Sequence, residues 1–325
     1  MYPFDSEGFL IIYPRRAMSS LPYNDLARAM RERFGCRVQK VTLDAGFTCP
    51  NRDGKVGTGG CIYCNTRGSG TGAFSSLSVR EKLERGKAAL EKRYKAEKFI
   101  AYFQSFSNTY GPVETLRRRY EEALGVPEVV GLAVGTRPDC VDDEVLDLLA
   151  ELNRRSFVSV EYGLQSAHDR TLELINRGHT FSVFQEAVDR TRRRGVDVCV
   201  HVILGLPGEG RREMLETAEA LAGMDIQAVK IHLLYVVKGT VLHRLYESGA
   251  YRCLDREEYA GIVAEFLSLL PPSVVIHRLT GDPHPAELVA PQWALEKQAN
   301  LRAIREAMEE RNTWQGKSWK PGMSF

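Results

Sequence analysis

Three cysteines lie close together in the glycine-rich stretch TCPNRDGKVGTGGCIYCN, residues 48–65. Cys61 and Cys64 form a Cys-x-x-Cys pair, and Cys49 precedes Cys61 by twelve positions. Two thiolates at the spacing of the pair can reach one metal centre. A structural zinc site would need a fourth ligand, such as Cys36 or a distant histidine. The alternative is a four-iron, four-sulfur cluster held by three cysteines, in which one iron has no protein ligand and can bind a substrate.

The cysteine stretch directly follows the first of seven segments that we expect to be buried β-strands. Each is a short run rich in β-branched residues, and helical stretches separate most of them. Near-continuous apolar strands alternating with helices are typical of a parallel sheet covered by helices. We therefore predict an α/β fold, a partial or near-complete TIM-like (β/α) barrel. The strand segments are RVQKVTLDAG, KFIAYFQSF, VVGLAVGTRP, FVSVEYGLQS, VDVCVHVILGLPG, AVKIHLLYVV and SVVIHRLTGDP.

Polar and glycine-rich sequences stand at the ends of the first five strands. They are the cysteine stretch, QSFSNTYG, GTRPD, EYGLQS and GLPGE. In a barrel of parallel strands the active site forms at the C-terminal ends of the strands. Turn formation alone explains the glycines, but it does not explain Glu161, Gln165 and His201, which lie within strands or at their last residues.

The segments outside the strands complete a three-part division of the chain. Residues 1–37 are expected to form an N-terminal extension with one helix, YNDLARAMRERFG, closed by Gly35. Residues 38–285 form the barrel, and residues 286–325 form a C-terminal helix and a tail whose last dozen residues we expect to be mobile.

Composition indicates a soluble cytoplasmic protein. The chain has seven cysteines, an odd number, and its N-terminus lacks the pattern of a secretory signal peptide, so we expect reduced thiols. No apolar run approaches the roughly 20 residues needed to cross a bilayer, and we expect no membrane contact. The net charge of +2 does not by itself indicate nucleic-acid binding. The local basic runs RRRY at 117–120 and RTRRRG at 190–195 are compatible with it.

The succession of motifs along the chain resembles the radical S-adenosylmethionine (radical SAM) superfamily. Tyr63 is the aromatic residue typical before the last cysteine, and GTRPD, VEYGLQS, INRGHT, HVILGLPGE and LLYVVKGTVL follow in order. The usual superfamily spacing is Cys-x3-Cys-x2-Cys, whereas eleven residues separate Cys49 and Cys61 here. The radical domain of the Elongator catalytic subunit also has widely separated first cysteines, and the chain is similar to that domain and to its stand-alone bacterial and archaeal relatives over roughly residues 38–285.

The resemblance implies a set of cofactor-binding residues. Cys49, Cys61 and Cys64 would hold a [4Fe-4S] cluster, and SAM would chelate the open iron. Contacts to SAM would come from residues at or near the ends of the second to fifth strands. These are Gln104, Ser105, Thr136, Arg137, Glu161, Gln165, Arg177 and His201.

Structural roles remain open for several of these residues. Gln104 and Ser105 could stabilise a turn at the end of a strand. Arg137 could pair with Asp139 or Glu161 as part of the scaffold, and Glu161 needs a partner because an unpaired buried carboxylate is costly. That partner could be a group of the cofactor, or Arg137 or Arg177. His201 could be an ordinary core histidine.

The resemblance also implies the type of reaction. One electron from the reduced cluster would cleave SAM to methionine and a 5′-deoxyadenosyl radical, which would take a hydrogen atom from the substrate. A flavodoxin- or ferredoxin-like protein would supply the electron. The Elongator branch suggests the side chain of a tRNA wobble uridine as substrate. His232, Tyr235, Lys238 and Thr240 could face it or merely complete the barrel.

Two other functions remain as alternatives. One is a radical SAM enzyme that acts on a small molecule, as the oxygen-independent coproporphyrinogen oxidases do. The other is a zinc-stabilised RNA-binding protein. The sequence indicates no oligomeric state and no role for Cys36, Cys140 or Cys253, while Cys199 is expected to pack within its strand.

Overall fold

The computed structural model describes residues 21–65, 68 and 77–321. Most of the expected N-terminal extension, residues 1–20, lies outside the described residues, as do residues 322–325 of the expected tail. The statements below concern the described residues.

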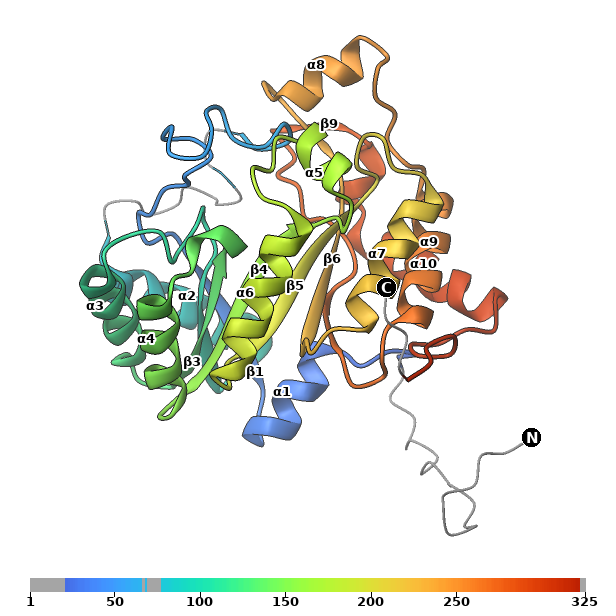
Figure 1. Cartoon of the computed structure of the whole chain (residues 1–325). Helices are drawn as coiled ribbons and strands as arrows, with labels where there is room; N and C mark the ends of the chain where they lie inside the picture. The colour runs from blue at the N-terminus through green and yellow to red at the C-terminus, as the bar shows by residue number, and fades with distance from the viewer. Residues whose placement is uncertain (1–20, 66–67, 69–76, 322–325) are drawn as a thin grey trace.

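Seven parallel strands form one sheet that curls into a half barrel (Figure 1). Every neighbouring pair in the sheet is parallel, and β1 and β8 are the two edges. All seven strand segments expected from the sequence are present, and the predicted partial barrel is confirmed. In spatial order the strands are β1 (Val38–Leu43), β2 (Lys98–Phe103), β3 (Val129–Thr136), β4 (Phe157–Gln165), β5 (Asp197–Leu204), β6 (Ala228–Leu233) and β8 (Val275–Arg278).

Helices cover the outer face of the sheet, as parallel strand connections require. The main apolar core lies between these helices and the sheet, where Phe103 packs edge-on against Tyr120 with 5.1 Å between ring centroids. Because one sheet face is buried there and the other lines the barrel interior, the strands read as apolar runs. The covering helices are α2 (Val79–Tyr94), α3 (Val113–Leu124), α4 (Asp143–Asn153), α6 (Phe181–Arg193), α7 (Arg211–Ala222), α9 (Arg256–Leu269) and α10 (Lys297–Glu310). The short helices α5 (Asp169–Leu174) and α8 (Val241–Glu247) lie beyond the C-terminal ends of the strands (Figure 1).

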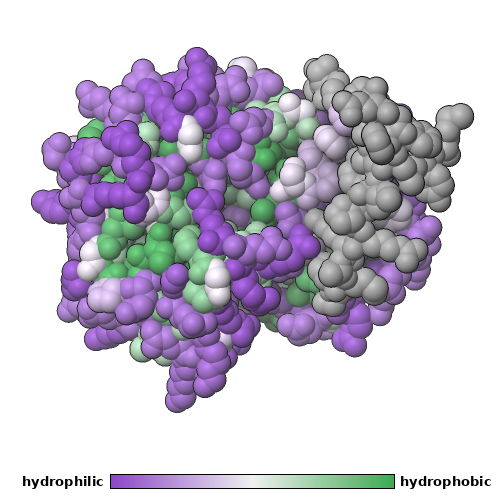
Figure 2. All heavy atoms as spheres, turned by 90° about the horizontal axis from the view of Figure 1, so that it is seen from below, coloured by the Kyte–Doolittle hydropathy of each residue, from purple (hydrophilic) through white to green (hydrophobic). Residues whose placement is uncertain are grey.

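Helix α1 (Leu26–Phe34) lies at the N-terminal ends of the strands. Asp25 caps its first turn, and Gly35 ends it in the left-handed conformation at φ 72°, as predicted. Its residue Met30 joins Ile100 and Tyr102 in a small apolar cluster. Seen from below, this end of the molecule is mostly hydrophilic, with hydrophobic residues visible in the recesses (Figure 2). A second cavity lies at this lower end, between α1 and the strands, where Lys40, Phe157 and His277 line it, and the upper end of the barrel carries the loops.

A second small sheet stands apart from the half barrel. Strand β7 (Val236–Val237) pairs antiparallel with β9 (Leu288–Ala290). Short 3-10 helices occupy Pro138–Cys140 and Gln292–Leu295. No helix within the described residues has the length and apolar character needed to cross a membrane.

The expected mobility of the last dozen residues is wrong for the described part of that segment. Gln315 is buried, and its amide nitrogen donates to the carbonyl oxygens of Pro271 and Val274 at 2.7 and 2.8 Å. Its amide oxygen accepts from the backbone N–H of Asn24 at 2.8 Å. The backbone N–H of Ser318 donates to the carbonyl of Ser268. The polar composition that suggested a free tail reflects side chains that pair with backbone groups of distant segments.

Replacing Gln315 by Ala should lower the free energy of unfolding by about 2–3 kcal/mol, because three backbone groups lose their partner. Urea unfolding measures the change. Gln292→Ala is the matched control, since that exposed side chain makes a single hydrogen bond to Val289. Equal stability of the two variants would contradict the packing described here.

Candidate functional site

One cavity at the C-terminal ends of the strands collects most of the predicted site residues. Its volume is about 150 Å³. Nine of the eleven predicted residues line it, and Ser105 and Gln165 do not. The nine are Cys49, Cys61, Cys64, Gln104, Thr136, Arg137, Glu161, Arg177 and His201.

The long insert between Cys49 and Cys61 folds back on itself. The backbone N–H of Val56 donates to the carbonyl of Pro50 at 2.9 Å, and that of Gly60 donates to Asn51 at 2.8 Å. The insert is thus a compact loop, which returns the chain to Cys61 beside the cavity.

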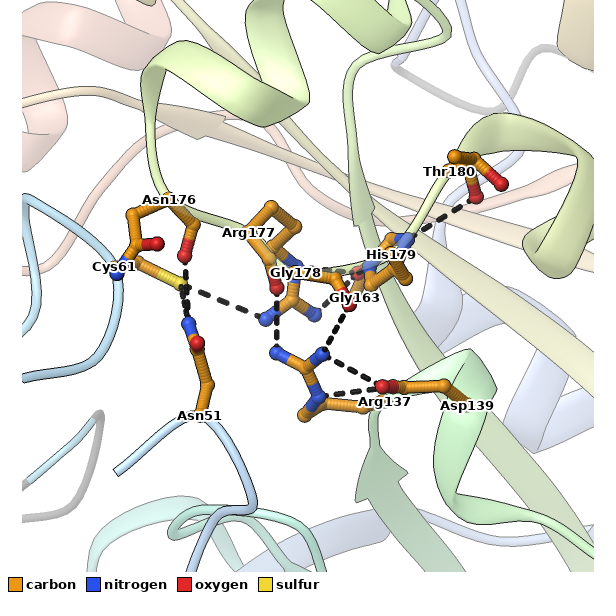
Figure 3. A network of polar contacts seen from close by, with 10 residues as sticks. All are labelled: Asn51, Cys61, Arg137, Asp139, Gly163, Asn176, Arg177, Gly178, His179 and Thr180. Atoms are coloured by element: carbon orange, nitrogen blue, oxygen red, sulfur yellow. Dashed lines mark hydrogen bonds and ion pairs between the residues drawn. The ribbon is translucent and has the colours of Figure 1, made fainter. Parts of the chain in front are cut away.

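The residues of the NRGH motif hold this loop in place (Figure 3). The side-chain amide of Asn51 donates to the carbonyl of Asn176 at 2.6 Å, and that of Asn176 donates to the carbonyl of Gly60 at 2.8 Å. Gly178 has φ 74°, and a Cβ there would lie 2.9 Å from Cγ1 of Val56. This close approach requires glycine, and it explains why the motif and the cysteine loop occur together.

Arg177 connects the cysteine loop with the barrel. Its Nε and Nη2 donate to the carbonyl oxygen of Gly163 on β4, and its Nη1 lies 3.7 Å from Sγ of Cys61. The amide nitrogen of Asn51 lies 3.8 Å from the same sulfur. Two donors directed at one cysteine sulfur suit a metal-bound thiolate, because hydrogen bonds to sulfur stabilise its negative charge and tune the potential of a cluster.

Arg137 has the scaffold role that the sequence left open. Its Nε and Nη2 bind both carboxylate oxygens of Asp139 at 2.9 and 2.7 Å. Its Nη1 donates to the carbonyl of Arg177 at 2.6 Å, and Nη2 also approaches the carbonyl of Gly178 at 3.3 Å. The guanidinium therefore supports the NRGH segment (Figure 3).

Glu161 is fully buried, and its partners differ from those expected. Neither Arg137 nor Arg177 contacts it within the described residues. Its carboxylate instead binds Nζ of Lys40 at 2.5 Å, Nζ of Lys230 at 2.6 Å and Nε2 of His201 at 2.7 Å. Of the partners left open by the sequence, the two arginines are therefore not used, because the interior of the curled sheet brings β1, β5 and β6 around β4.

The protonation states inside the barrel follow from this pairing. Burial alone would raise the pKa of Glu161, but the ammonium groups of Lys230 and Lys40 outweigh it and hold the pKa well below its ordinary value. Burial, with Lys230 nearby, lowers the pKa of His201 to about 4. His201 is therefore neutral at pH 7. Because an ionised carboxylate only accepts, Nε2 of His201 carries the hydrogen and donates it to Glu161.

The remaining predicted residues have distinct surroundings. Thr136 donates its hydroxyl to Oγ1 of Thr109 at 2.6 Å, since Thr109 in turn donates to the carbonyl of Cys140. The Oγ of Ser105 is buried and has no hydrogen-bond partner in the described structure. Gln165 ends β4 with φ 83° and lies outside the cavity lining.

The three loop cysteines fit a cluster better than a single zinc ion. Zinc holds thiolates at about 2.3 Å, which places tetrahedral sulfurs about 3.8 Å apart. Cys49, Cys61 and Cys64 are free thiols and, among the described residues, do not form a group with all ligand atoms within 4.8 Å. Sulfurs bound to separate irons of one cluster must lie farther apart than sulfurs that share one ion. Burial and the neighbouring Cys61 raise the pKa of Cys64 to about 11, so a bound metal centre is needed to hold a thiolate there.

One compact set of ligand-type atoms does exist, formed by Glu161, Cys199 and His201. It is not a metal site, because the ammonium groups of Lys40 and Lys230 already contact the carboxylate and repel a cation.

Lys40 and Lys230 are the partners of Glu161 that sequence reasoning missed. The available signal was a lysine within an apolar strand segment, as in AVKIHLL.

Replacing Asn51 by Ala should loosen the insert, because the bonds to Asn176 and Cys61 are lost. Amide hydrogen exchange over residues 50–60 should become at least about tenfold faster. Asn153→Ala, which changes an asparagine remote from the loop, should leave exchange over these residues unchanged. Unchanged exchange in the Asn51 variant would contradict the role of Asn51 in holding the insert in place.

The neutral state of His201 predicts a pH dependence of stability. The unfolded chain binds a proton at His201 below about pH 6.5, whereas the folded protein binds it only near pH 4. The free energy of unfolding should therefore fall by up to about 3 kcal/mol as the pH drops through this window. In urea unfolding at pH 7 and pH 4.5, His201→Gln should lose most of this contribution. If the free energy of unfolding of the variant fell between pH 7 and pH 4.5 by as much as that of the wild type, a neutral His201 would be contradicted.

Comparison with known proteins agrees with the geometry. The radical SAM superfamily matches residues 52–221, and a radical SAM C-terminal domain matches residues 226–310. The chain is 44% identical to the protein YtqA of Bacillus subtilis over 296 residues, covering 91% of this chain and 92% of that protein. The archaeal Elp3 of Methanocaldococcus infernus shares the fold, with a TM-score of 0.67 at 19% identity, over 86% of this chain and 64% of that one.

A relative whose name states an enzymatic activity matches a shorter part of the chain. The tRNA uridine(34) acetyltransferase of Dehalococcoides mccartyi is 29% identical over 204 residues, which is 59% of this chain but only 42% of that enzyme. The match of the superfamily to more than half of the chain, and the high identity to a relative of nearly equal length, establish the family. The chain belongs to the radical SAM superfamily and is a radical SAM enzyme whose cofactors are a [4Fe-4S] cluster and SAM.

Proposed function

We propose that this enzyme modifies the side chain of a tRNA wobble uridine. The observation that supports this substrate is the similarity to the tRNA uridine(34) acetyltransferase, which extends over 204 residues and 59% of this chain. The shared segment covers less than half of that enzyme, so the proposal concerns the type of substrate and not acetyl transfer.

Cys49, Cys61 and Cys64 are the proposed cluster ligands, because all three line the cavity and two donors are directed at Cys61. When bound, the cluster and SAM supply a 5′-deoxyadenosyl radical that takes a hydrogen atom from the substrate. The chain's own contribution is to bind, orient and shield. Arg177 and Asn51 orient Cys61. The hydrogen bonds of Asn176 with Asn51 and Gly60 fix the loop that carries Cys61.

The proposed contacts to SAM divide into three groups. Gln104, Thr136 and His201 line the cavity and keep a proposed direct role. Arg137, Arg177 and Glu161 have polar partners in the protein and act as positioning residues in this proposal. Ser105 and Gln165 do not line the cavity. In this proposal they contribute only by shaping the backbone at the ends of β2 and β4.

The two basic runs are poor candidates for the RNA surface. Arg117 forms a two-pronged pair with Glu151, both contacts at 2.8 Å. In the second run, Arg190 and Arg194 bind Asp143, and Arg192 binds Asp225. These arginines mainly connect neighbouring helices and loops, so tRNA contacts in this proposal lie elsewhere, toward the mouth of the cavity.

Three further features belong to the proposal. A one-electron donor of the flavodoxin or ferredoxin type reduces the cluster. The protein works in the cytoplasm, where thiols remain reduced. The division into residues 1–37, 38–285 and 286–325 is retained as a proposed domain organisation.

The cysteine assignment predicts the iron content of variants. After anaerobic reconstitution, the wild-type protein should contain about four irons and four sulfides per chain. Cys49→Ser, Cys61→Ser and Cys64→Ser should each lose most of this iron. Cys253→Ser should retain it, because Cys253 does not line the cavity. A colourless wild-type protein that carries one zinc would overturn the assignment.

The substrate assignment is tested by the nucleosides of tRNA. Cells without the gene should accumulate one modified wobble uridine and lack the nucleoside derived from it, and a plasmid copy should restore the wild-type profile. A copy with Cys61→Ser should fail to restore it. Identical profiles with and without the gene would reject a wobble uridine as the substrate.

A further inference from the structure

A group of cationic and neutral nitrogen donors lies on the side of the cavity formed by β6 and β8. Lys230 on β6 and Arg278 on β8 are partners across the two strands. His232 stands two positions after Lys230, so both point to the same face of β6. Lys230, His232 and Arg278 all line the cavity.

These three side chains have hydrogen-bonding capacity that the described protein does not use. Lys230 donates to Glu161 at 2.6 Å and to the hydroxyl of Tyr102 at 3.0 Å, which leaves one of its three donors. Arg278 has one distant ion pair, with Asp282 at 3.9 Å. Nε2 of His232 is buried and has no partner among the described residues. Buried polar groups are normally paired, so a ligand is the natural partner for this set.

The charges around the cavity do not balance. Glu161 is the only carboxylate among the described residues that line it, and it contacts both Lys40 and Lys230. Arg278 adds a further positive charge at the same side. SAM brings no net negative charge to this side of the cavity, because its sulfonium and ammonium groups outnumber its single carboxylate. Arg278 is 33% exposed and its one ion pair is long, at 3.9 Å, so its guanidinium remains available to an anion in the cavity.

We propose that Lys230, His232 and Arg278 form a subsite for an anionic group of the substrate, a carboxylate or a phosphate. This inference deepens the proposed function, since it assigns a chemical feature to the substrate of the same cavity. A carboxylate would lie on the side chain of the modified uridine, whereas a phosphate would belong to the RNA backbone. Arg278 can bind either group with two parallel N–H donors.

The first experiment measures anion binding alone. The reconstituted, SAM-bound protein is titrated calorimetrically with malonate and, separately, with inorganic phosphate. We expect saturable binding of one anion per chain, weakened at least about tenfold by Arg278→Gln. Arg252→Gln is the matched control, because that exposed arginine pairs with Glu258 away from the cavity. No saturable binding of either anion to the wild type, or equal binding by both variants, would overturn the subsite.

The second experiment separates this inference from the proposed substrate. Anticodon stem-loop RNAs carry either 5-carboxymethyluridine or its amide, 5-carbamoylmethyluridine, at the wobble position. A carboxylate subsite predicts at least about tenfold tighter binding of the acid by the wild type, and loss of this preference in Arg278→Gln. A phosphate subsite predicts equal binding of both RNAs and a loss for both in the variant.

The two experiments fail in different ways. If malonate or phosphate binds through Arg278 but neither RNA binds, the wobble-uridine proposal is wrong and the subsite stands. If both RNAs bind and Arg278→Gln changes neither, the subsite is wrong and the RNA substrate stands.

Discussion

The buried carboxylate of Glu161 is the interaction on which the interior of this half barrel depends. A carboxylate without solvent costs several kcal/mol unless cations and donors surround it. Lys40 from edge strand β1 and Lys230 from β6 meet this requirement. Nζ of Lys40 also lies 3.3 Å from Nδ1 of His277 on the other edge strand, β8. Side chains in the interior thus connect the two edges of a sheet that backbone pairing leaves open.

This polar group divides the barrel into two regions. Below it, the small apolar cluster around Ile100 and Tyr102 lies near a second cavity, which residues of α1 line together with Lys40 and His277. Above it, the cavity has the cysteine loop on one side and Lys230, His232 and Arg278 of β6 and β8 on the other. Arg177 joins the upper parts, because it binds both the backbone of β4 and the sulfur of Cys61. In the proposed function, the cluster site and the anion subsite therefore lie around one cavity.

The sequence predicts local features of this structure well and long-range pairings poorly. The seven strands are recognisable because strands buried on both faces become apolar runs, and the cysteine loop is recognisable from its thiols. The partners of Glu161 are not recognisable, since Lys40 lies 121 residues away and Lys230 lies 69 residues away. Only the curvature of the sheet decides which strands face each other. The same limit explains Gln315, whose partners are backbone groups near residues 24 and 271.

The central claim is that a cluster with an open iron at the cysteine loop faces this cavity. The most direct test is electron paramagnetic resonance of the reduced, reconstituted protein before and after addition of SAM. A cluster whose open iron binds SAM should show a [4Fe-4S]⁺ signal that changes shape when SAM is added, accompanied by formation of 5′-deoxyadenosine. A signal that SAM leaves unchanged, with no 5′-deoxyadenosine formed, would contradict the account.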